Sequence, residues 1–347
     1  MTGTIVRVLV VDDSAYVRKV VSQILSRSPF LEVVATARDG REALEIAHEQ
    51  LPDVITCDLN MPEMDGVAFV NEQMARRPTP ILIMSVANRA GEQVLAALEA
   101  GAVDFVHKPT ALASERLMEM AEELIQKVKA AAAAPVRARR TISSANPTRL
   151  ARRGPAAAGN VDVVVMGIST GGPQGLKQVI PRLPADFPVP ILIVLHMPVG
   201  YTELYARKLD EISALTVSEA RQGDEMTSGH VLLAPAGRHL SVRRDGVSLR
   251  AHLDLRPLAL PHRPAADVLF QSAAEVCAGR TLAVVMTGMG ADGRDGAAWI
   301  KARGGCVLTE SEETCVVYGM PRAVAEAGLS DASVPIDRMA AAILERL

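Results

Sequence analysis

Three segments in the second half of the chain place side chains that could do chemistry directly after apolar runs. VDVVVM is followed by GISTGGP, which contains Ser169; PILIVL is followed by His196; and TLAVVM is followed by TGMGADG, which contains Asp292. A serine hydroxyl is a weak nucleophile until a base takes its proton, and histidine is a suitable base. An acid must then orient the imidazole and stabilise its cation. Asp292, or the less favourably placed Asp295, could be that acid, so the pattern predicts a serine hydrolase.

The glycines on both sides of Ser169 suit a sharp turn from strand to helix, which would expose the hydroxyl. The N-terminus of the following helix offers free N–H groups to a developing oxyanion. Thr170, next to the serine, and Met289, in the third segment, are the candidates for residues around that oxyanion. A glycine-rich turn is equally a cradle for a nucleotide phosphate. The order serine, histidine, aspartate also differs from that of α/β-hydrolases, which disfavours a standard member of that class.

A second constellation lies in the first half of the chain, again at the ends of apolar runs. Asp12 and Asp13 follow the first run, Asp58 ends another, and Ser85 and Lys108 end two more. Carboxylates that meet at one edge repel each other unless a cation lies between them, and Mg²⁺ prefers oxygen ligands of this kind. Lys108 and Ser85 would supply a positive charge and a hydroxyl to a bound phosphoryl group. A single aspartate here could merely cap a helix, but five such residues predict a phosphoryl site.

Short β-branched runs alternate with amphipathic stretches throughout, which is typical of βαβ units in parallel sheets. The predicted strands lie at 5–11, 31–36, 53–58, 80–85, 103–107, 161–166, 189–195, 281–286 and 305–309. The first five, each with a helix, predict a small flavodoxin-like sheet. The other four predict a doubly wound, mostly parallel α/β domain. Asp245-Gly246 splits two alternating runs in VLLAPAGRHLSVRRDGVSLR, which predicts an antiparallel hairpin in that domain.

A stretch without acidic residues separates the two halves. It is rich in Ala, Arg, Pro, Ser and Gly, and such a composition buries too little apolar surface to offset the entropy of ordering. We therefore expect domains at 1–128 and 161–347 and a basic, flexible linker at 129–160. A basic run can also contact nucleic acid or an acidic partner, but no aromatic residue in it could stack on bases.

The overall composition favours an ordinary globular protein. The 37 Lys and Arg and 40 Asp and Glu give a net charge of −3, which argues against a polyanionic partner such as nucleic acid. No run reaches the roughly 18–20 apolar residues of a membrane span, and the N-terminus lacks the basic start of a signal peptide. We therefore expect no membrane insertion. The four cysteines are scattered without CxxC spacing, so we expect a reducing, cytoplasmic location.

In the first half, VVDDS, CDLNMPEMDG and VHKP resemble the receiver domain of bacterial two-component response regulators, over residues 1 to about 125. The resemblance implies that Asp58 accepts a phosphoryl group from a histidine kinase. It also implies metal ligation by Asp12, Asp13, Asp58 and the backbone carbonyl of Asn60, with Mg²⁺ as the cofactor. Ser85 stands where the family has a switch hydroxyl, and Lys108 matches the family lysine.

In the second half, GISTGGP, HMP, APAGRHL, HRPAADVLF, MTGMGADG and VVYGMPRAV are similar to the catalytic domain of chemotaxis methylesterases, over residues 161 to about 330. This family combines protein-glutamate methylesterase and protein-glutamine glutaminase activities. The resemblance implies Ser169 as nucleophile, His196 as general base and acid, and Asp292 as the orienting carboxylate. It implies methylated chemoreceptors as substrates and no cofactor for hydrolysis. Leu195 and Ile168 differ from the residues that this family usually has at these positions. These differences affect the expected substrate preference and leave the triad unchanged.

Two other functional classes compete with this interpretation. A response regulator with a DNA-binding second half is disfavoured, because that half shows no helix-turn-helix pattern and is not basic. A dinucleotide-dependent oxidoreductase is disfavoured, because neither GISTGG nor GMGADG matches GxGxxG well and no acid is placed to bind a ribose. With these alternatives disfavoured, the resemblance implies a phosphorylation-activated serine hydrolase that demethylates glutamate methyl esters and deamidates glutamines on chemoreceptors.

Overall fold

The structure is a computed structural model, and it describes residues 5–85, 91–108, 114–133 and 161–347. The chain divides into two compact units, residues 1–143 and 144–347. The last helix of the first unit continues to Ala132, so it includes the first residues of the segment expected as a linker. Residues 134–160 of that segment lie outside the described part of the chain.

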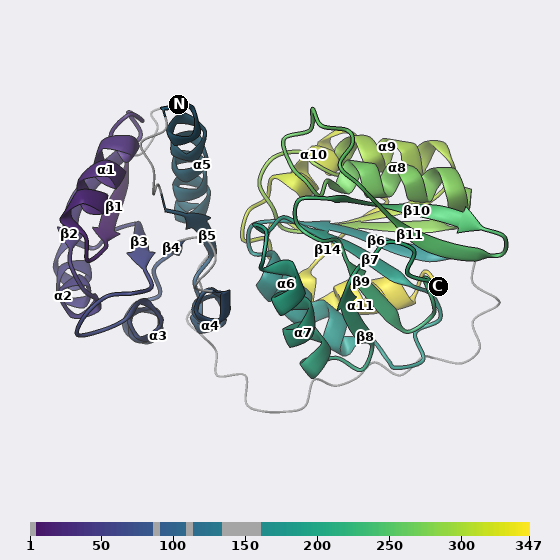
Figure 1. Cartoon of the computed structure of the whole chain (residues 1–347), viewed down its shortest axis with the longest axis horizontal. Helices are drawn as coiled ribbons and strands as arrows, with labels where there is room; N and C mark the ends of the chain where they lie inside the picture. Colours follow the sequence, from purple (N-terminus) through teal and green to yellow (C-terminus); the bar gives the residue numbers. More distant parts are fainter. Residues whose placement is uncertain (1–4, 86–90, 109–113, 134–160) are drawn as a thin grey trace. The chain divides into compact units, whose positions relative to one another are not determined.

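The first unit is a five-stranded parallel sheet with strand order β2-β1-β3-β4-β5 (Figure 1). Its elements are β1 (Val6–Val11), α1 (Ala15–Leu25), β2 (Leu31–Ala37), α2 (Gly40–Gln50), β3 (Val54–Asp58), α3 (Gly66–Arg76), β4 (Ile81–Ser85), α4 (Gly91–Ala100), β5 (Asp104–His107) and α5 (Ser114–Ala132). All five predicted strands of this half are confirmed within one residue at each end. Each strand leads into a helix, as the flavodoxin-like prediction required.

The loops at the carboxyl edge of this sheet follow from local sequence. Ser14 begins α1 by accepting the N–H of Val17, and Asp65 begins α3 by accepting the N–H of Ala68. At Gly66 a Cβ atom would lie only 2.2 Å from the carbonyl oxygen of Asp58. Only glycine fits there, and the close approach holds the end of β3 against the start of α3.

The second unit has a seven-stranded sheet with order β14-β13-β12-β6-β7-β9-β8, in which every pairing is parallel. Its elements are β6 (Val163–Ile168), α6 (Gly172–Val179), η1 (Ile180–Arg182), β7 (Ile191–Leu195), α7 (Thr202–Ile212), β8 (Thr216–Glu219), β9 (His230–Leu233), β10 (His239–Asp245), β11 (Ser248–Asp254), α8 (Ala266–Cys277), η2 (Ala278–Arg280), β12 (Thr281–Val285), α9 (Arg294–Ala302), β13 (Cys306–Glu310), α10 (Met320–Glu326), β14 (Ala332–Val334) and α11 (Ile336–Leu344). Within this unit, α8, α9 and α10 cover one face of the sheet, and α6, α7 and α11 cover the other (Figure 1). The predicted doubly wound architecture is confirmed.

The predicted hairpin is confirmed as β10 and β11, which pair antiparallel and pack against α8. Its turn contains Gly246 with φ of 59°, a left-handed conformation that favours glycine. The preceding VLL run instead forms β9 in the parallel sheet. No pattern in the sequence predicts β8 or β14, because these edge strands are only four and three residues long.

The centre of the second sheet is almost entirely apolar, with Thr281 at the start of β12 as its one polar side chain. Every residue of β6, β7 and β12 is buried, because helices cover both faces of these strands. The three strands lie side by side, with β6 between β7 and β12. The functional segments predicted from the sequence follow the carboxyl ends of these strands. No helix in the described part of the chain has both the length and the apolar character needed to cross a membrane.

Candidate phosphorylation and catalytic sites

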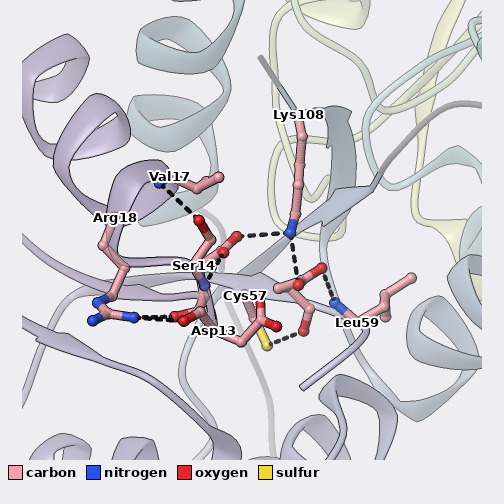
Figure 2. Close-up of polar contacts among 9 residues, drawn as sticks. Asp13, Ser14, Val17, Arg18, Cys57, Leu59 and Lys108 are labelled. Carbon is pink, nitrogen blue, oxygen red and sulfur yellow. Dashed lines mark hydrogen bonds and ion pairs between the residues drawn. The ribbon is translucent and has the colours of Figure 1, made fainter. Parts of the chain in front are cut away.

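Buried acids and one lysine meet at the carboxyl edge of the first sheet. Asp12, directly after β1, is fully buried, and Asp58, the last residue of β3, is 3% exposed. The Nζ of Lys108, which follows β5, lies 2.8 Å from Oδ2 of Asp12 and 2.6 Å from Oδ2 of Asp58. Figure 2 shows this lysine extending from its strand end towards the carboxylates. The structure thus brings together three of the predicted residues from three strands.

Charge and burial oppose each other at this cluster. Burial raises the pKa of Asp12 above its ordinary value, although the nearby lysine acts in the other direction. Burial alone would lower the pKa of Lys108, but the two carboxylates outweigh it and raise that pKa. The ammonium is therefore held charged between two acids, and the site retains a net negative charge that a cation could neutralise.

Three carboxylates lie close enough to share one cation. Asp12, Asp13 and Asp58 each offer an oxygen, and these atoms all lie within 4.8 Å of one another. The Arg18 guanidinium donates to the backbone carbonyls of Asp12 and Asp13, which fixes the loop that carries them (Figure 2). An all-oxygen set of this kind fits a hard divalent cation such as Mg²⁺. Asn60 lies two residues past Asp58 with an exposed side chain.

The remaining predicted residue of this edge is Ser85, at the end of β4. It is 1% exposed, and its backbone carbonyl accepts the N–H of Lys108 at 2.8 Å. The neighbouring strand ends are therefore joined through the backbone.

In the second unit, Ser169 and His196 follow two neighbouring parallel strands. Ile168 pairs with Leu195 at the ends of β6 and β7, and the N–H of His196 donates to the Ile168 carbonyl at 3.1 Å. On the other side, the N–H of Ser169 donates to the carbonyl of Thr287, just beyond β12, at 3.0 Å. Backbone hydrogen bonds therefore join all three functional segments at one edge.

His196 and Asp292 are joined by a direct hydrogen bond. Nε2 of the imidazole lies 2.8 Å from Oδ2 of Asp292, and the two side chains are only 10% and 9% exposed. With Nε2 donating to the carboxylate, Nδ1 carries the lone pair, and it is buried with no hydrogen-bond partner among the described residues. Asp295 does not reach this site, because its carboxylate is exposed and pairs with Arg294 at 2.8 Å. Of the two acids that the sequence left open, the structure brings Asp292 to the histidine.

Asp292 is fixed by more than the histidine. Its carboxylate accepts the backbone N–H groups of Ala266 at 2.7 Å, Asp267 at 3.0 Å and Gly293 at 3.1 Å. Burial would raise the pKa of Asp292, but the hydrogen bonds from His196 and these N–H groups outweigh it and lower that pKa to about 2. The acid therefore stays ionised and can stabilise an imidazolium.

The loop after β12 lies against the serine. A Cβ atom at Gly288 would lie 2.8 Å from Cβ of Ser169 and 2.5 Å from Sδ of Met320, so only glycine fits. The Thr287 hydroxyl donates to the carbonyl of Thr170 at 2.9 Å, which joins this loop to the turn after β6. The two residues predicted around the oxyanion, Thr170 and Met289, thus belong to loops that contact each other beside Ser169.

The sequence analysis missed three polar residues of this site. The His262 ring stacks on His196, with centroids 4.3 Å apart and planes 23° apart. Asp267 accepts the N–H of Gly293, next to Asp292. Glu310 is fully buried, and burial raises its pKa even though it accepts the N–H of Thr287. Glu310 ends β13, so the strand-end criterion could have found it, whereas the other two lie in a loop and a helix.

Two protein-family matches together cover most of the chain. Residues 164–343 match the CheB methylesterase family, and residues 8–122 match the response regulator receiver domain. The chain belongs to the CheB methylesterase family. It is 49% identical over 97% of its length to protein-glutamate methylesterase/protein-glutamine glutaminase 5 of Myxococcus xanthus, of which the alignment covers 96%. The chain is also 45% identical to the protein-glutamate methylesterase/protein-glutamine glutaminase of Symbiobacterium thermophilum, with 97% of this chain and 96% of that protein covered.

A solved CheB structure gives the same result for the second unit. The catalytic domain of Thermotoga maritima CheB methylesterase superimposes with a TM-score of 0.53 at 42% identity, covering 54% of this chain and 99% of that domain. The predicted combination of a receiver domain and a methylesterase domain is therefore confirmed. The DNA-binding and oxidoreductase alternatives are excluded by the same matches.

Proposed function

We propose that residues 161–347 form a hydrolase in which Ser169, His196 and Asp292 cleave glutamate γ-methyl esters on chemoreceptors. The same site would deamidate glutamine side chains, as the names of its relatives state for those proteins. The observation that carries this proposal is the buried 2.8 Å contact between His196 and Asp292 beside the strand end that bears Ser169. Because Nε2 of His196 is bonded to Asp292, Nδ1 is the nitrogen that would receive the serine proton.

Acylation follows from these positions. Nδ1 of His196 takes the hydroxyl proton while the oxygen of Ser169 attacks the ester carbonyl carbon, and Asp292 stabilises the imidazolium. The negative charge moves to the former carbonyl oxygen, where the N–H groups of Thr170 and Met289 would bind it. As the intermediate collapses, the carbon–oxygen bond to the methoxy group breaks. The imidazolium returns its proton to that group, and methanol leaves.

Deacylation uses the same groups with water as the nucleophile. His196 takes a proton from water, the hydroxide attacks the acyl carbon, and the imidazolium protonates the departing oxygen of Ser169. The products are free serine and a glutamate carboxylate, with release of the carboxyl proton at neutral pH. For a glutamine substrate the first leaving group is ammonia in place of methanol.

Residues 1–128, which make up most of the first unit, would be the switch. A histidine kinase would transfer a phosphoryl group to Asp58, with Mg²⁺ held by Asp12, Asp13, Asp58 and the backbone carbonyl of Asn60. The ion, when bound, offsets the negative charge that the acids and the phosphoryl group bring together. Lys108 would bind a phosphoryl oxygen as a fixed positive charge, and Ser85 would respond through its hydroxyl. Residues 129–160 would connect this switch to the hydrolase.

The four cysteines are free thiols, of which three are buried, and this fits the reducing cytoplasm as the place of action. The cytoplasm is also where a kinase could supply the phosphoryl group.

A fluorophosphonate probe tests the hydrolase. We expect it to label the full chain covalently at Ser169, and we expect Ser169→Ala to remain unlabelled. The same preparations should release methanol from methylated receptor only when the serine is present. Labelling at another residue, or methanol release by Ser169→Ala, would refute the assignment of the nucleophile.

A further inference from the structure

Two helices of the second unit cap each other at their N-termini. Asp292, just before α9, accepts the N–H groups of Ala266 at 2.7 Å and Asp267 at 3.0 Å, which are the first two residues of α8. In return, Oδ1 of Asp267 accepts the N–H groups of Gly293 at 2.9 Å and Gly296 at 2.7 Å, at the start of α9. The Gly293 N–H is shared, because Oδ1 of Asp292 also accepts it at 3.1 Å. The carboxylates of Asp267 and Asp292 therefore lie side by side and accept the same N–H group.

The close contact of the two helices fixes this arrangement. A Cβ atom at Gly296 would lie 2.6 Å from Cβ of Phe270 and 2.9 Å from Cα of Asp267. Only glycine lets α9 approach α8 this closely. The carboxylate of Asp267 is consequently held at the start of α9 by the backbone of both helices.

We propose that Asp267 is a positioning residue for the hydrolase: it holds Asp292 against His196 and, when ionised, adds a second negative charge behind the imidazolium. This inference rests on the proposed function, because it assigns a role to a residue through the catalytic acid. A cap alone needs only an acceptor oxygen, so the carboxylate supplies charge beyond what the cap requires.

The surroundings of Asp267 place its pKa within the range from pH 5 to pH 8, where turnover can be measured. Burial, with Asp292 and Asp295 as negative neighbours, raises the pKa of Asp267 to about 6, although the N–H of Gly296 opposes this shift. Arg294 is the cation that faces this carboxyl group from α9, and its side chain is exposed and paired with Asp295. Since Asp292 itself has a pKa of about 2, it is ionised throughout. The pair of carboxylates behind His196 thus carries one negative charge below a pH of about 6 and two above it.

The second charge should increase the rate of reaction. When His196 takes a proton in the transition state, an ionised Asp267 attracts the imidazolium, while a protonated Asp267 does not. The gain belongs to the transition state and not to substrate binding, so it should be seen in kcat and leave KM unchanged.

Asp267→Asn separates charge from capping, because the amide oxygen can still accept both N–H groups. Methanol release would be measured with the full chain on a peptide that carries a glutamate γ-methyl ester, from pH 5 to pH 8. The ratio of wild-type kcat to variant kcat is expected to rise from about one at pH 5 to about ten at pH 8, which corresponds to one pKa unit of differential stabilisation. Its midpoint should lie near the Asp267 pKa of about 6.

Asp295→Asn is the matched control, since this nearby carboxylate is 70% exposed and pairs with Arg294. Its ratio to wild type should be close to one at pH 5 and at pH 8, with only a small deviation near pH 6, because Asp295 contributes one part of the shift in the Asp267 pKa. Asp267→Glu, which restores the charge, should restore the rise of kcat with pH, so that its ratio to wild type is close to one at both pH 5 and pH 8. Thermal unfolding at pH 5, where the wild-type acid is mostly protonated, should give the same midpoint for wild type and Asp267→Asn.

A flat ratio for Asp267→Asn, whether equal to one or uniformly reduced, would overturn the inference and leave Asp267 as a structural cap. If Asp267→Asn does not fold, the comparison passes to Asp267→Glu, which must shift the midpoint of the acid limb of kcat; an unchanged midpoint refutes the inference. Absence of methanol release by the wild-type chain would instead refute the proposed function, and this inference with it.

Discussion

Replacing Asp292 by asparagine removes the charge behind His196 with little change in shape. The amide oxygen can still accept N–H groups from the start of α8, so the fold should persist. The imidazolium formed during catalysis, however, would lose its partner at 2.8 Å. The asparagine NH₂ can also favour the wrong tautomer of the histidine, as is known for other triads.

The expected loss follows from the separation of the two charges. With an effective dielectric constant of about 20 and charge centres roughly 3–4 Å apart, the attraction is about 4–6 kcal/mol. This corresponds to a decrease in kcat of about 10³–10⁴-fold. Loss of the nucleophile or the base should cost more, on the order of 10⁶-fold, because either one disables the unit.

The variant should also be less stable. Asp292 has its pKa lowered from 3.8 to about 2, so its ionised form stabilises the fold by about 2–3 kcal/mol above a pH of about 4. That contribution is lost as the pH falls through 2. Urea unfolding should therefore separate wild type from Asp292→Asn at pH 7, and the difference should shrink towards pH 2.

Methanol release and fluorophosphonate labelling of Ser169 measure the catalytic loss directly. Asp295→Asn provides the control for removal of a nearby carboxylate, and it should retain wild-type turnover. A decrease of less than tenfold in Asp292→Asn, in a folded protein, would show that this carboxylate is not the partner of the imidazolium.

Three further predictions concern the nucleophile, the loop beside it and the switch. Ser169→Ala and His196→Gln should each abolish methanol release while Asp58 is still phosphorylated by a small phosphodonor; near-normal turnover would exclude a covalent mechanism. Gly288→Ala should reduce turnover at least tenfold, because its Cβ would lie 2.8 Å from that of Ser169, and a fully active variant would show that the loop can shift freely. Phosphorylation of Asp58 should require Mg²⁺, so excess EDTA should prevent it, and it should raise methanol release by roughly 5–150-fold; labelling that persists in EDTA would contradict the acidic metal site.

Most of the site residues that could be predicted from the sequence lie at the ends of predicted strands. Parallel strands bring their carboxyl ends to one edge, so an apolar run followed by a polar side chain located Asp58 and Lys108 in one unit and His196 in the other. Asp267 escaped this reasoning because it lies in the first turn of a helix, where an acid ordinarily serves as a helix-stabilising charge. Its contact with Asp292 depends on how α8 and α9 approach each other, which no local pattern encodes. The stacking of His262 on His196 arises in the same way, from a loop whose path is set by tertiary packing.

The order of strands in the second sheet has a consequence for how activity is acquired during folding. Ser169 follows β6, but the strand beside it, β12, begins only at Thr281, and the histidine and its acid are 96 positions apart in sequence. Contacts between such distant segments form slowly, because the intervening chain must first be closed into a loop. A nascent or truncated chain that ends before β12 cannot assemble the site, even with the nucleophile and base already synthesised. Recovery of esterase activity after denaturation should therefore lag behind recovery of helical circular dichroism.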